Sequence, residues 1–278
     1  MPKVSVIIPC FNQGKYIDET LNSVLAQNYD DYEIVIVNDG STDEFTNNLL
    51  RDYRRPKTRV IHTDNQGLSM ARNTAIQAAT GAYILPLDAD DLIGREYLGK
   101  AVEILDGNRG IGIVTCLIEF FGAMNFQPVL PPFTAEAVLV RNDLPCSSFF
   151  RREDWERAGG FNPNMKAGWE DWDFWLTLLE FDLEVQRIPE VLFYYRIRKD
   201  SMLRSMVKEH RVQMYLQLYQ NHQAYYQKHM RAVFSELCTF QEITGSRSYR
   251  LARYLERPSL VLEKMRNVLL QFTQGRRN

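Results

Sequence analysis

The chain has 278 residues, of which 45% are hydrophobic and 12% aromatic, so it can bury the core of one large α/β domain or of two modest ones. Its formal net charge of -2 argues against a nucleic-acid-binding protein. The charge is unevenly distributed, because residues 1–203 carry a net -10 and residues 204–278 a net +8. We therefore expect a basic C-terminal extension with a role of its own, such as contact with an anionic surface.

The four cysteines are far apart in the sequence and show no zinc-ligand spacing. Buried free thiols in a reducing compartment are the simplest interpretation. We expect no signal peptide, and no apolar stretch approaches the roughly 20 residues that span a bilayer. The sequence thus predicts a cytoplasmic protein, or one that lies peripherally at the inner face of the membrane.

Apolar runs alternate with helical patterns in the first half of the chain. The runs are short and rich in β-branched residues, which is typical of strands covered on both faces. This alternation predicts an α/β fold with a mostly parallel, doubly wound sheet, whose ligands bind beyond the carboxyl ends of the strands. Strands are expected at 4–8, 34–37, 60–62 and 83–87, and helices at 15–27, 43–53 (capped by Ser41) and 68–79.

After about residue 110 the alternation becomes less regular. Strands are predicted at 111–118, 137–140 and 191–196, a loop at 122–135 and a helix at 170–181. Residues 204–278 are helix-compatible, and Pro258 is expected to open a last helix. That helix has an apolar stripe suited to packing on protein or on a membrane surface. The stripe consists of Val261, Met265, Val268, Leu269 and Phe272.

The strongest local signal is the acidic cluster Asp88-Ala89-Asp90-Asp91 after the fourth strand. Asp88 and Asp90 are two residues apart, so an extended backbone directs both carboxylates the same way. Mg²⁺ and Mn²⁺ take carboxylate and phosphate oxygens as ligands, so this pair can hold a metal that neutralises a diphosphate. The alternative is a helix N-terminus that is capped by Asp91 and begins at Leu92.

Two other loops carry candidate binding residues. Asp39 follows the second strand and can accept a hydrogen bond from the imide N–H of uracil or thymine, although an ordinary Asp-Gly turn is an alternative. Gly67 permits a tight entry into the third helix. Arg72 on that helix either offers a guanidinium fork to a phosphate or base, or is a surface arginine.

A second acidic motif lies in the segment Gly168–Trp175. Glu170 and Asp171 open a helix, whose positive end favours their ionised forms, and a carboxylate there can act as general base toward a hydroxyl. Trp169 and Trp172 either stack on a sugar or belong to the core. Core packing is the simpler interpretation for Trp175.

Five segments in this order resemble the family-2 glycosyltransferases of the GT-A fold: 4–12, 37–43, 65–73, 88–91 and 168–175. The similarity covers about residues 2–202. It implies inverting hexosyl transfer from a UDP- or dTDP-sugar to a carbohydrate or lipid-linked acceptor, with Mn²⁺ or Mg²⁺ as cofactor, in cell-surface polysaccharide or glycolipid synthesis. It implies a GT-A domain at 1–203, with a nucleotide-sugar half (1–110) and an acceptor half (111–203), followed by a basic helical extension at 204–278.

The resemblance also implies roles for the donor-site residues. Asp39 reads the pyrimidine, and Arg72 lies beside the nucleotide. Asp88-Ala89-Asp90 is the DXD motif, whose two acids contact the diphosphate and hold the metal. The first loop lines the nucleotide pocket with Pro9, Phe11 and Asn12.

On the acceptor side, the resemblance makes Asp171 the catalytic base. Glu170 lies beside it, and Trp169 and Trp172 are expected to contact the acceptor. One position departs from the family pattern, because Arg198 stands where His is common. Arginine cannot ligate a cation, so either metal binding is weaker here, or Arg198 holds the diphosphate directly, or the segment is a solvated basic loop.

Other classes of protein remain as alternatives. A metal-dependent nucleotidyltransferase also joins an α/β sheet to acidic ligands, but the first loop is poor in glycine and the Glu-Asp motif would have no function. A non-catalytic nucleotide-sugar-binding or scaffold protein would need no base. A dehydrogenase is disfavoured, because no G-x-G-x-x-G follows the first strand.

Overall fold

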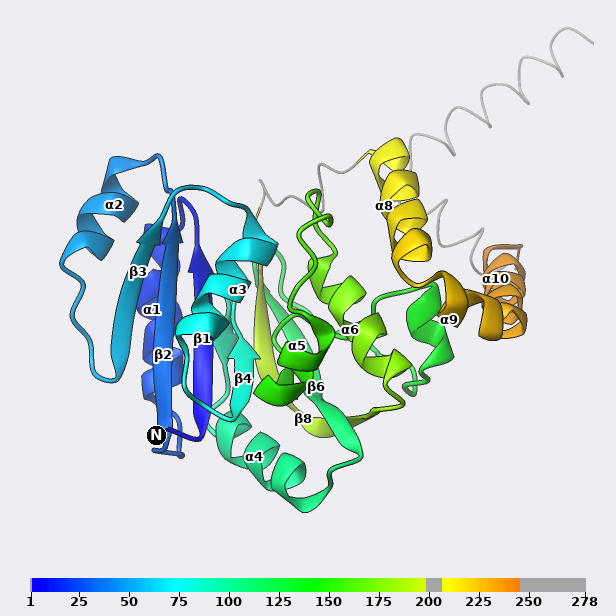
Figure 1. Cartoon of the computed structure of the whole chain (residues 1–278), viewed down its shortest axis with the longest axis horizontal. Helices are drawn as coiled ribbons and strands as arrows, with labels where there is room; N and C mark the ends of the chain where they lie inside the picture. Colours follow the sequence, from blue (N-terminus) through cyan, green and yellow to red (C-terminus); the bar gives the residue numbers. More distant parts are fainter. Residues whose placement is uncertain (1, 199–206, 246–278) are drawn as a thin grey trace, which may run out of the picture. The chain divides into compact units, whose positions relative to one another are not determined.

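A computed structural model describes residues 2–198 and 207–245 of the chain (Figure 1). The chain divides into two compact units, Met1–Lys228 and His229–Asn278. The described part of the second unit contains the helix α10 (Met230–Gly245). The expected division at residue 203 lies in a segment outside the described residues and stays a prediction.

The first unit is built on one mixed, mostly parallel sheet, which has eight strands within the described residues. Their order is β3-β2-β1-β4-β7-β6-β8-β5. Strand β7 is antiparallel to both of its neighbours, and the short β5 is antiparallel to β8. The bounds are β1 Val4–Cys10, β2 Tyr32–Asp39, β3 Thr58–Thr63, β4 Tyr83–Pro86, β5 Leu92–Ile93, β6 Ile111–Gly122, β7 Phe149–Arg151 and β8 Glu184–Ile197.

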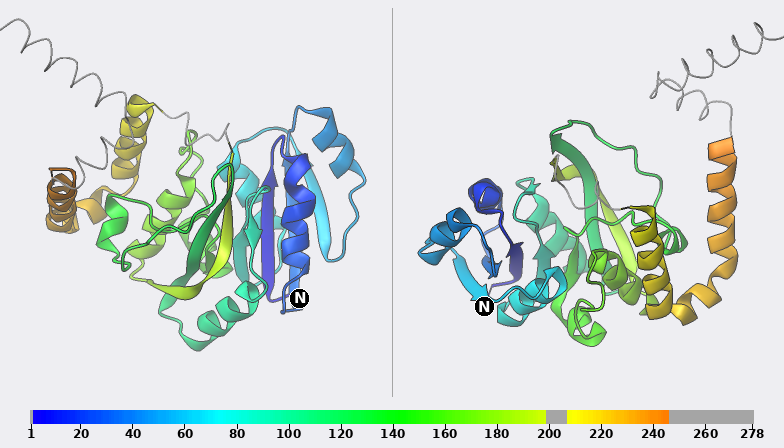
Figure 2. Two further views of the ribbon diagram at one scale, coloured as in Figure 1. Left: turned by 180° about the vertical axis from the view of Figure 1, so that it is seen from behind. Right: turned by 90° about the horizontal axis from the view of Figure 1, so that it is seen from above.

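Helices cover both faces of this sheet (Figures 1 and 2). One face packs on α1 (Gly14–Leu25) and α4 (Tyr97–Gly107), and the buried cluster there includes Val6, Ile8, Leu21 and Leu98. The other face packs on α3 (Leu68–Ala78) and on α6 (Glu170–Glu180). The remaining elements are α2 (Glu44–Arg51), the 3₁₀ helix η1 (Glu136–Leu139), α5 (Arg152–Ala158), α8 (Lys208–Asn221) and α9 (Gln223–Lys228).

The expected α/β class and most expected elements are confirmed. β1, β2 and β4 read as continuous apolar runs because they lie buried between two helical layers. Cys10 and Cys116 are buried free thiols as expected, whereas Cys146 is partly exposed and Cys238 exposed. Within the described residues, none of the helices is both long and apolar enough to cross a bilayer.

Three local predictions are wrong. The cap of α2 is Asp43, which accepts a hydrogen bond from the Thr46 N–H at 2.7 Å, and not Ser41. The strand expected at 137–140 is not formed: residues 137–139 lie in η1, Val140 is its C-cap, and Ala137, Val138 and Leu139 are buried without pairing with any described strand. The helix expected to begin at Leu92 begins at Tyr97, because Leu92 and Ile93 pair with β8.

The final helix expected from Pro258 and its apolar stripe lie outside the described residues. The helical character expected after residue 204 is confirmed for α8, α9 and α10. Of these, α8 and α9 belong to the same compact unit as the sheet.

Candidate functional site

Asn12 links the loop that follows β1 to the loop that follows β2 through hydrogen bonds. Its side-chain oxygen accepts hydrogen bonds from the backbone N–H groups of Thr42 and Asp43, at 2.7 and 3.0 Å. Asn12 itself has a left-handed backbone (φ 57°). Phe11 beside it is 44% exposed, whereas Pro9 is buried in the end of β1. Of the three residues expected to line a nucleotide pocket, Phe11 therefore offers a large exposed surface.

Asp39, at the end of β2, organises the loop that leads into α3. Its two carboxylate oxygens accept hydrogen bonds from the backbone N–H groups of Gln66 and Gly67, both at 2.9 Å. The Thr63 hydroxyl donates a third bond at 3.1 Å. Each carboxylate oxygen can accept two bonds, so Oδ2 retains the capacity to accept one from a ligand.

Arg72 is the centre of the site and is buried, with 1% of its side chain exposed. One guanidinium nitrogen lies 2.8 Å from Asp88, which follows β4, and another donates to Glu170 at the start of α6. It also contacts the sulfur of Cys146 at 3.2 Å. Burial lowers the pKa of Arg72, but the surrounding anions raise it overall, so the guanidinium stays charged. The alternative of a surface arginine is therefore wrong.

Asp90 lies beside Asp88 but is more buried and has a different partner. Burial and the neighbouring Asp88 raise the pKa of Asp90 to about 6. Its Oδ2 atom lies 3.2 Å from Nε of Arg198. Ala89 between the two acids is buried, and its carbonyl accepts a hydrogen bond from Thr20 at 2.9 Å. This bond fixes the turn that presents the acids.

Asp91 has a structural role. It is buried and accepts a hydrogen bond from the backbone N–H of Arg196 at 2.8 Å. The Arg196 side chain in turn donates to the Asp90 carbonyl at 2.7 Å. These bonds tie the acidic turn to β8, so Asp91 does not cap a helix as the alternative interpretation held.

Asp171, in the first turn of α6, accepts hydrogen bonds from neutral donors, whereas its neighbours Glu170 and Asp173 pair with Arg72 and His222. Its Oδ2 accepts a bond from the Asn142 side chain at 3.2 Å, and Oδ1 accepts one from the Trp172 N–H at 2.8 Å. Burial and the neighbouring Glu170 raise the pKa of Asp171 to about 7. A carboxylate with that pKa can exchange a proton near neutral pH.

The tryptophans of this motif differ in exposure. Trp175 is fully buried, as expected for core packing. Trp172 is 3% exposed, and its indole N–H donates to the Val138 carbonyl. Trp169 is half-buried at the N-cap of α6. An acceptor contact is therefore sterically open to Trp169 and closed to Trp172.

The structure thus brings together residues from distant parts of the chain. Arg72 joins Asp88 to Glu170, and Asp171 follows Glu170 directly. Asp39 lies at the loop that opens the Arg72 helix. Sequence reasoning missed Asn142, which lies in an irregular segment without any periodic signal.

The acids after β4 have the donor chemistry of a site for a divalent metal. Asp88 and Asp90 provide two carboxylates after one strand, which suits Mg²⁺ or Mn²⁺ if phosphate oxygens and water complete the coordination. The described residues contain no group of three or more His, Cys, Asp or Glu side chains that could hold a metal by themselves. The site therefore fits a metal that binds together with a diphosphate.

The family model for "Glycosyl transferase family 2" matches residues 5–160. The uncharacterized glycosyltransferase EpsJ of Bacillus subtilis (strain 168) is 32% identical over 73% of this chain and 63% of its own length. TuaG of the same organism, named as a candidate teichuronic acid biosynthesis glycosyltransferase, is 31% identical over 72% of this chain and 81% of its own. The chain thus spans less than two thirds of the length of EpsJ.

Two solved structures are similar in fold. Residues 1–349 of S. aureus TarS, in complex with UDP-GlcNAc, match 74% of this chain and 61% of that chain with a TM-score of 0.62 at 22% identity. The mannosyltransferase PcManGT of Pyrobaculum calidifontis, in complex with GDP-Man and Mn²⁺, matches 90% of this chain and 82% of that chain with a TM-score of 0.60 at 21% identity.

Proposed function

Because this chain belongs to glycosyltransferase family 2, we propose that it transfers a hexosyl group, with inversion, from a UDP- or dTDP-sugar to the hydroxyl of a carbohydrate or lipid-linked acceptor. The name of TuaG supports a role in cell-surface polysaccharide or glycolipid synthesis. We further propose a cytoplasmic location with peripheral membrane contact through the basic C-terminal segment.

One observation carries this proposal. Arg72 contacts both Asp88, on the donor side, and Glu170, directly before Asp171. A cation buried between these acids fixes the distance between the proposed diphosphate site and the proposed base. Fixed placement of the reacting groups is a large part of the rate enhancement in transfer reactions.

In the proposed reaction, Asp171 accepts the proton of the acceptor hydroxyl as its oxygen attacks the anomeric carbon. Asn142 donates to one carboxylate oxygen and orients the other for this task. Attack from the side opposite the nucleotide breaks the bond between the anomeric carbon and the diphosphate, which leaves with the electron pair. With a pKa of about 7, roughly half of the Asp171 carboxyl groups are ionised at neutral pH, and a base whose pKa matches the working pH is efficient in proton transfer.

On the donor side, Asp39 would accept a hydrogen bond from the pyrimidine imide through Oδ2. Asp88 and Asp90 would hold Mn²⁺ or Mg²⁺ together with the diphosphate oxygens. Such a metal supplies positive charge that stabilises the leaving nucleoside diphosphate. Arg198, which lies 3.2 Å from Asp90, can contribute charge at the same place.

A non-catalytic nucleotide-sugar-binding protein is the second candidate. Binding alone does not require a carboxylate with a pKa near 7 at the proposed acceptor side of the site. The raised pKa of Asp171 therefore favours an enzyme. In a nucleotidyltransferase, Asp171 would have no function.

The test is Asp171→Asn. This variant should bind UDP with nearly unchanged affinity in calorimetric titration, while release of UDP from a nucleotide-sugar falls by a factor of about 10² to 10⁴. Asp182→Asn is the matched control, because Asp182 is exposed and has a left-handed backbone that Asn tolerates. Turnover by Asp171→Asn at the wild-type rate would rule out the proposed base.

A further inference from the structure

Helix α8 packs against the start of α6, the helix that carries Asp171. Tyr215 of α8 contacts Trp169 with ring centroids 4.9 Å apart and planes at 72°. It also contacts Trp172, at 5.5 Å and 81°. Its hydroxyl donates to the Val140 carbonyl at 3.2 Å, so the ring is held at its tip as well as along its side.

Tyr215 is nevertheless 43% exposed, and Trp169 is half-buried. Because the two planes are steeply inclined, the rings form a corner and neither lies flat over the other. Trp172, which is 3% exposed, contacts both rings, with its ring centroid 4.9 Å from that of Trp169 and 5.5 Å from that of Tyr215. Aromatic rings that are fixed in orientation and open to solvent are typical of sites that recognise a ligand with an apolar face.

The backbone at Trp169 is unusual in a way that supports a ligand-binding role. Trp169 has φ 61°, in the left-handed region that bulky side chains rarely adopt, and it follows Gly168 with φ 109°. Trp169 stands at the N-cap of α6 and makes no side-chain capping bond. Strained backbone of this kind persists where the surrounding structure imposes it, often at binding sites.

The corner also lies close to the proposed base. Trp169 directly precedes Glu170 and Asp171, and the Val140 carbonyl that holds Tyr215 is two residues from Asn142, which donates to Asp171. Both aromatic rings and the base are therefore fixed to the same short segments. Through Trp169, the corner is therefore next to the proposed base along the chain.

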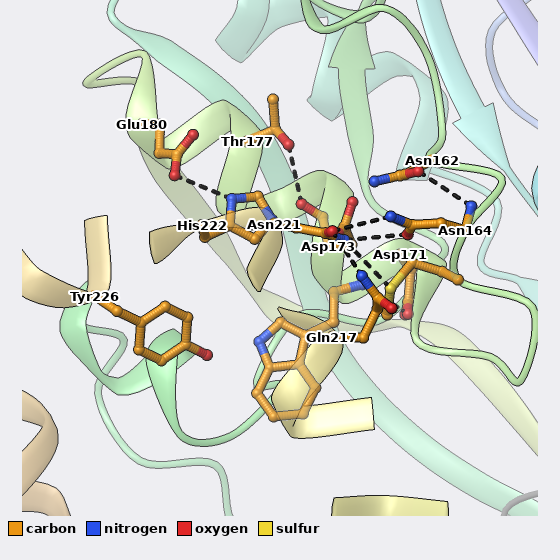
Figure 3. Close-up of polar contacts among 12 residues, drawn as sticks. Asn162, Asn164, Asp171, Asp173, Thr177, Glu180, Gln217, Asn221, His222 and Tyr226 are labelled. Atoms are coloured by element: carbon orange, nitrogen blue, oxygen red, sulfur yellow. Dashed lines mark hydrogen bonds and ion pairs between the residues drawn. The ribbon is translucent and has the colours of Figure 1, made fainter. Parts of the chain in front are cut away.

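The C-terminal end of α8 is anchored by a buried ionic cluster (Figure 3). His222 lies 3.2 Å from Asp173 and 3.0 Å from Glu180, both on α6. Asn221 donates to Asp173 as well and bonds to Asn164 at 3.0 Å. Asp173 lies two residues after Asp171, so the cluster fixes α8 relative to the helix of the proposed base.

We propose that Trp169 and Tyr215 form an acceptor subsite that stacks on the apolar C–H face of a pyranose ring and directs one of its hydroxyl groups toward Asp171. This inference rests on the proposed function and specifies the acceptor as a sugar ring. It also makes α8, outside the segment that the family model matches, part of the acceptor site.

The test is direct binding of methyl pyranosides to the full chain in the presence of saturating UDP, detected by saturation-transfer-difference NMR. In the wild type, the ring C–H protons of a pyranoside should receive saturation. Tyr215→Ala should weaken this binding by about three- to tenfold, while Tyr215→Phe, which keeps the ring, should retain most of it. Leu216→Ala is the matched control, since Leu216 lies on the same helix with 49% exposure. All variants should keep the wild-type UDP affinity.

Two results would overturn the proposal and leave the proposed function standing. In the first, Tyr215→Ala binds the pyranosides as tightly as the wild type does. In the second, the wild type binds UDP but none of the pyranosides. Failure of the wild type to bind UDP would instead overturn the proposed function, and the acceptor subsite with it. Circular dichroism of Tyr215→Ala separates loss of the ring from loss of the fold.

Discussion

Arg198 forms an ion pair with Asp90, with Nε 3.2 Å from the carboxylate Oδ2. Asp90 is an expected metal ligand, so in this arrangement a side-chain cation and a divalent cation would compete for the same oxygen. The Arg198 side chain is 23% exposed and that of Asp90 10%, so solvent screens the pair only in part. This ion pair is the physical consequence of having Arg198 at a position where His is common in the family.

Replacing Arg198 by His should strengthen metal binding. The substitution frees Oδ2 of Asp90 and adds a nitrogen that can ligate or support the metal. We expect Mn²⁺ affinity, measured by calorimetric titration in the presence of saturating UDP, to rise about three- to tenfold. Arg198→Gln, which frees Asp90 without adding a ligand, should give a smaller gain. Equal Mn²⁺ affinity of the wild type and Arg198→His would contradict the competition.

Asp171 should set the acid side of the pH–rate profile. With a pKa of about 7, the base is protonated at pH 6 and ionised at pH 8, so kcat should rise through neutrality. The measurement is the rate of UDP release from a saturating nucleotide-sugar between pH 5 and about 9. A profile that is flat across this range would count against Asp171 as the titrating group.

The same pKa predicts an effect on stability. The folded state binds the Asp171 proton more tightly than the unfolded state does, so wild-type stability falls as pH rises from about 4 to about 7. Asp171→Asn cannot ionise and should therefore be the more stable protein at pH 8, by roughly 1 kcal/mol or more after allowance for solvent screening. Urea unfolding at pH 5 and pH 8 checks this, and the advantage of the variant should be larger at pH 8.

Arg72→Met should destabilise the fold, because it leaves Glu170 buried without its cation. Glu170 is 4% exposed, and an uncompensated buried charge costs about 3–5 kcal/mol. The double variant Arg72→Met/Glu170→Gln removes both charges and should recover part of that loss. Urea unfolding measures both free energies. A loss below about 1 kcal/mol in the single variant would show that the buried pair is not coupled as its geometry indicates.

His222→Gln should destabilise the first unit in a pH-dependent way. Burial lowers the pKa of His222, but hydrogen bonds to Asp173 and Glu180 outweigh it and raise the pKa to about 9. The charged cluster therefore contributes its full stability below about pH 6.5 and loses it as pH rises through about 9. The cost of the substitution should be roughly 3 kcal/mol at pH 6 and should shrink by pH 10. His210→Gln, an exposed position on α8, is the control and should show no such cost.

The fold class and the identity of most candidate residues follow from the pattern of the amino-acid sequence. Buried parallel strands are apolar along their whole length, and helices repeat apolar residues every three to four positions. The local sequence pattern therefore predicts β1, β2, β4 and the neighbouring helices. The same logic placed Asp88 and Asp90 after a strand and Glu170 and Asp171 at a helix start.

The pairing of these residues depends on the folded chain. Local periodicity reports which face of an element is apolar, but not which distant side chain meets it. The contacts of Arg72 with Glu170, of Arg198 with Asp90 and of Tyr215 with Trp169 all join separate elements. The 3₁₀ turn at 136–139 was misread for the same reason, since strand identity depends on a hydrogen-bonding neighbour that the local sequence does not encode.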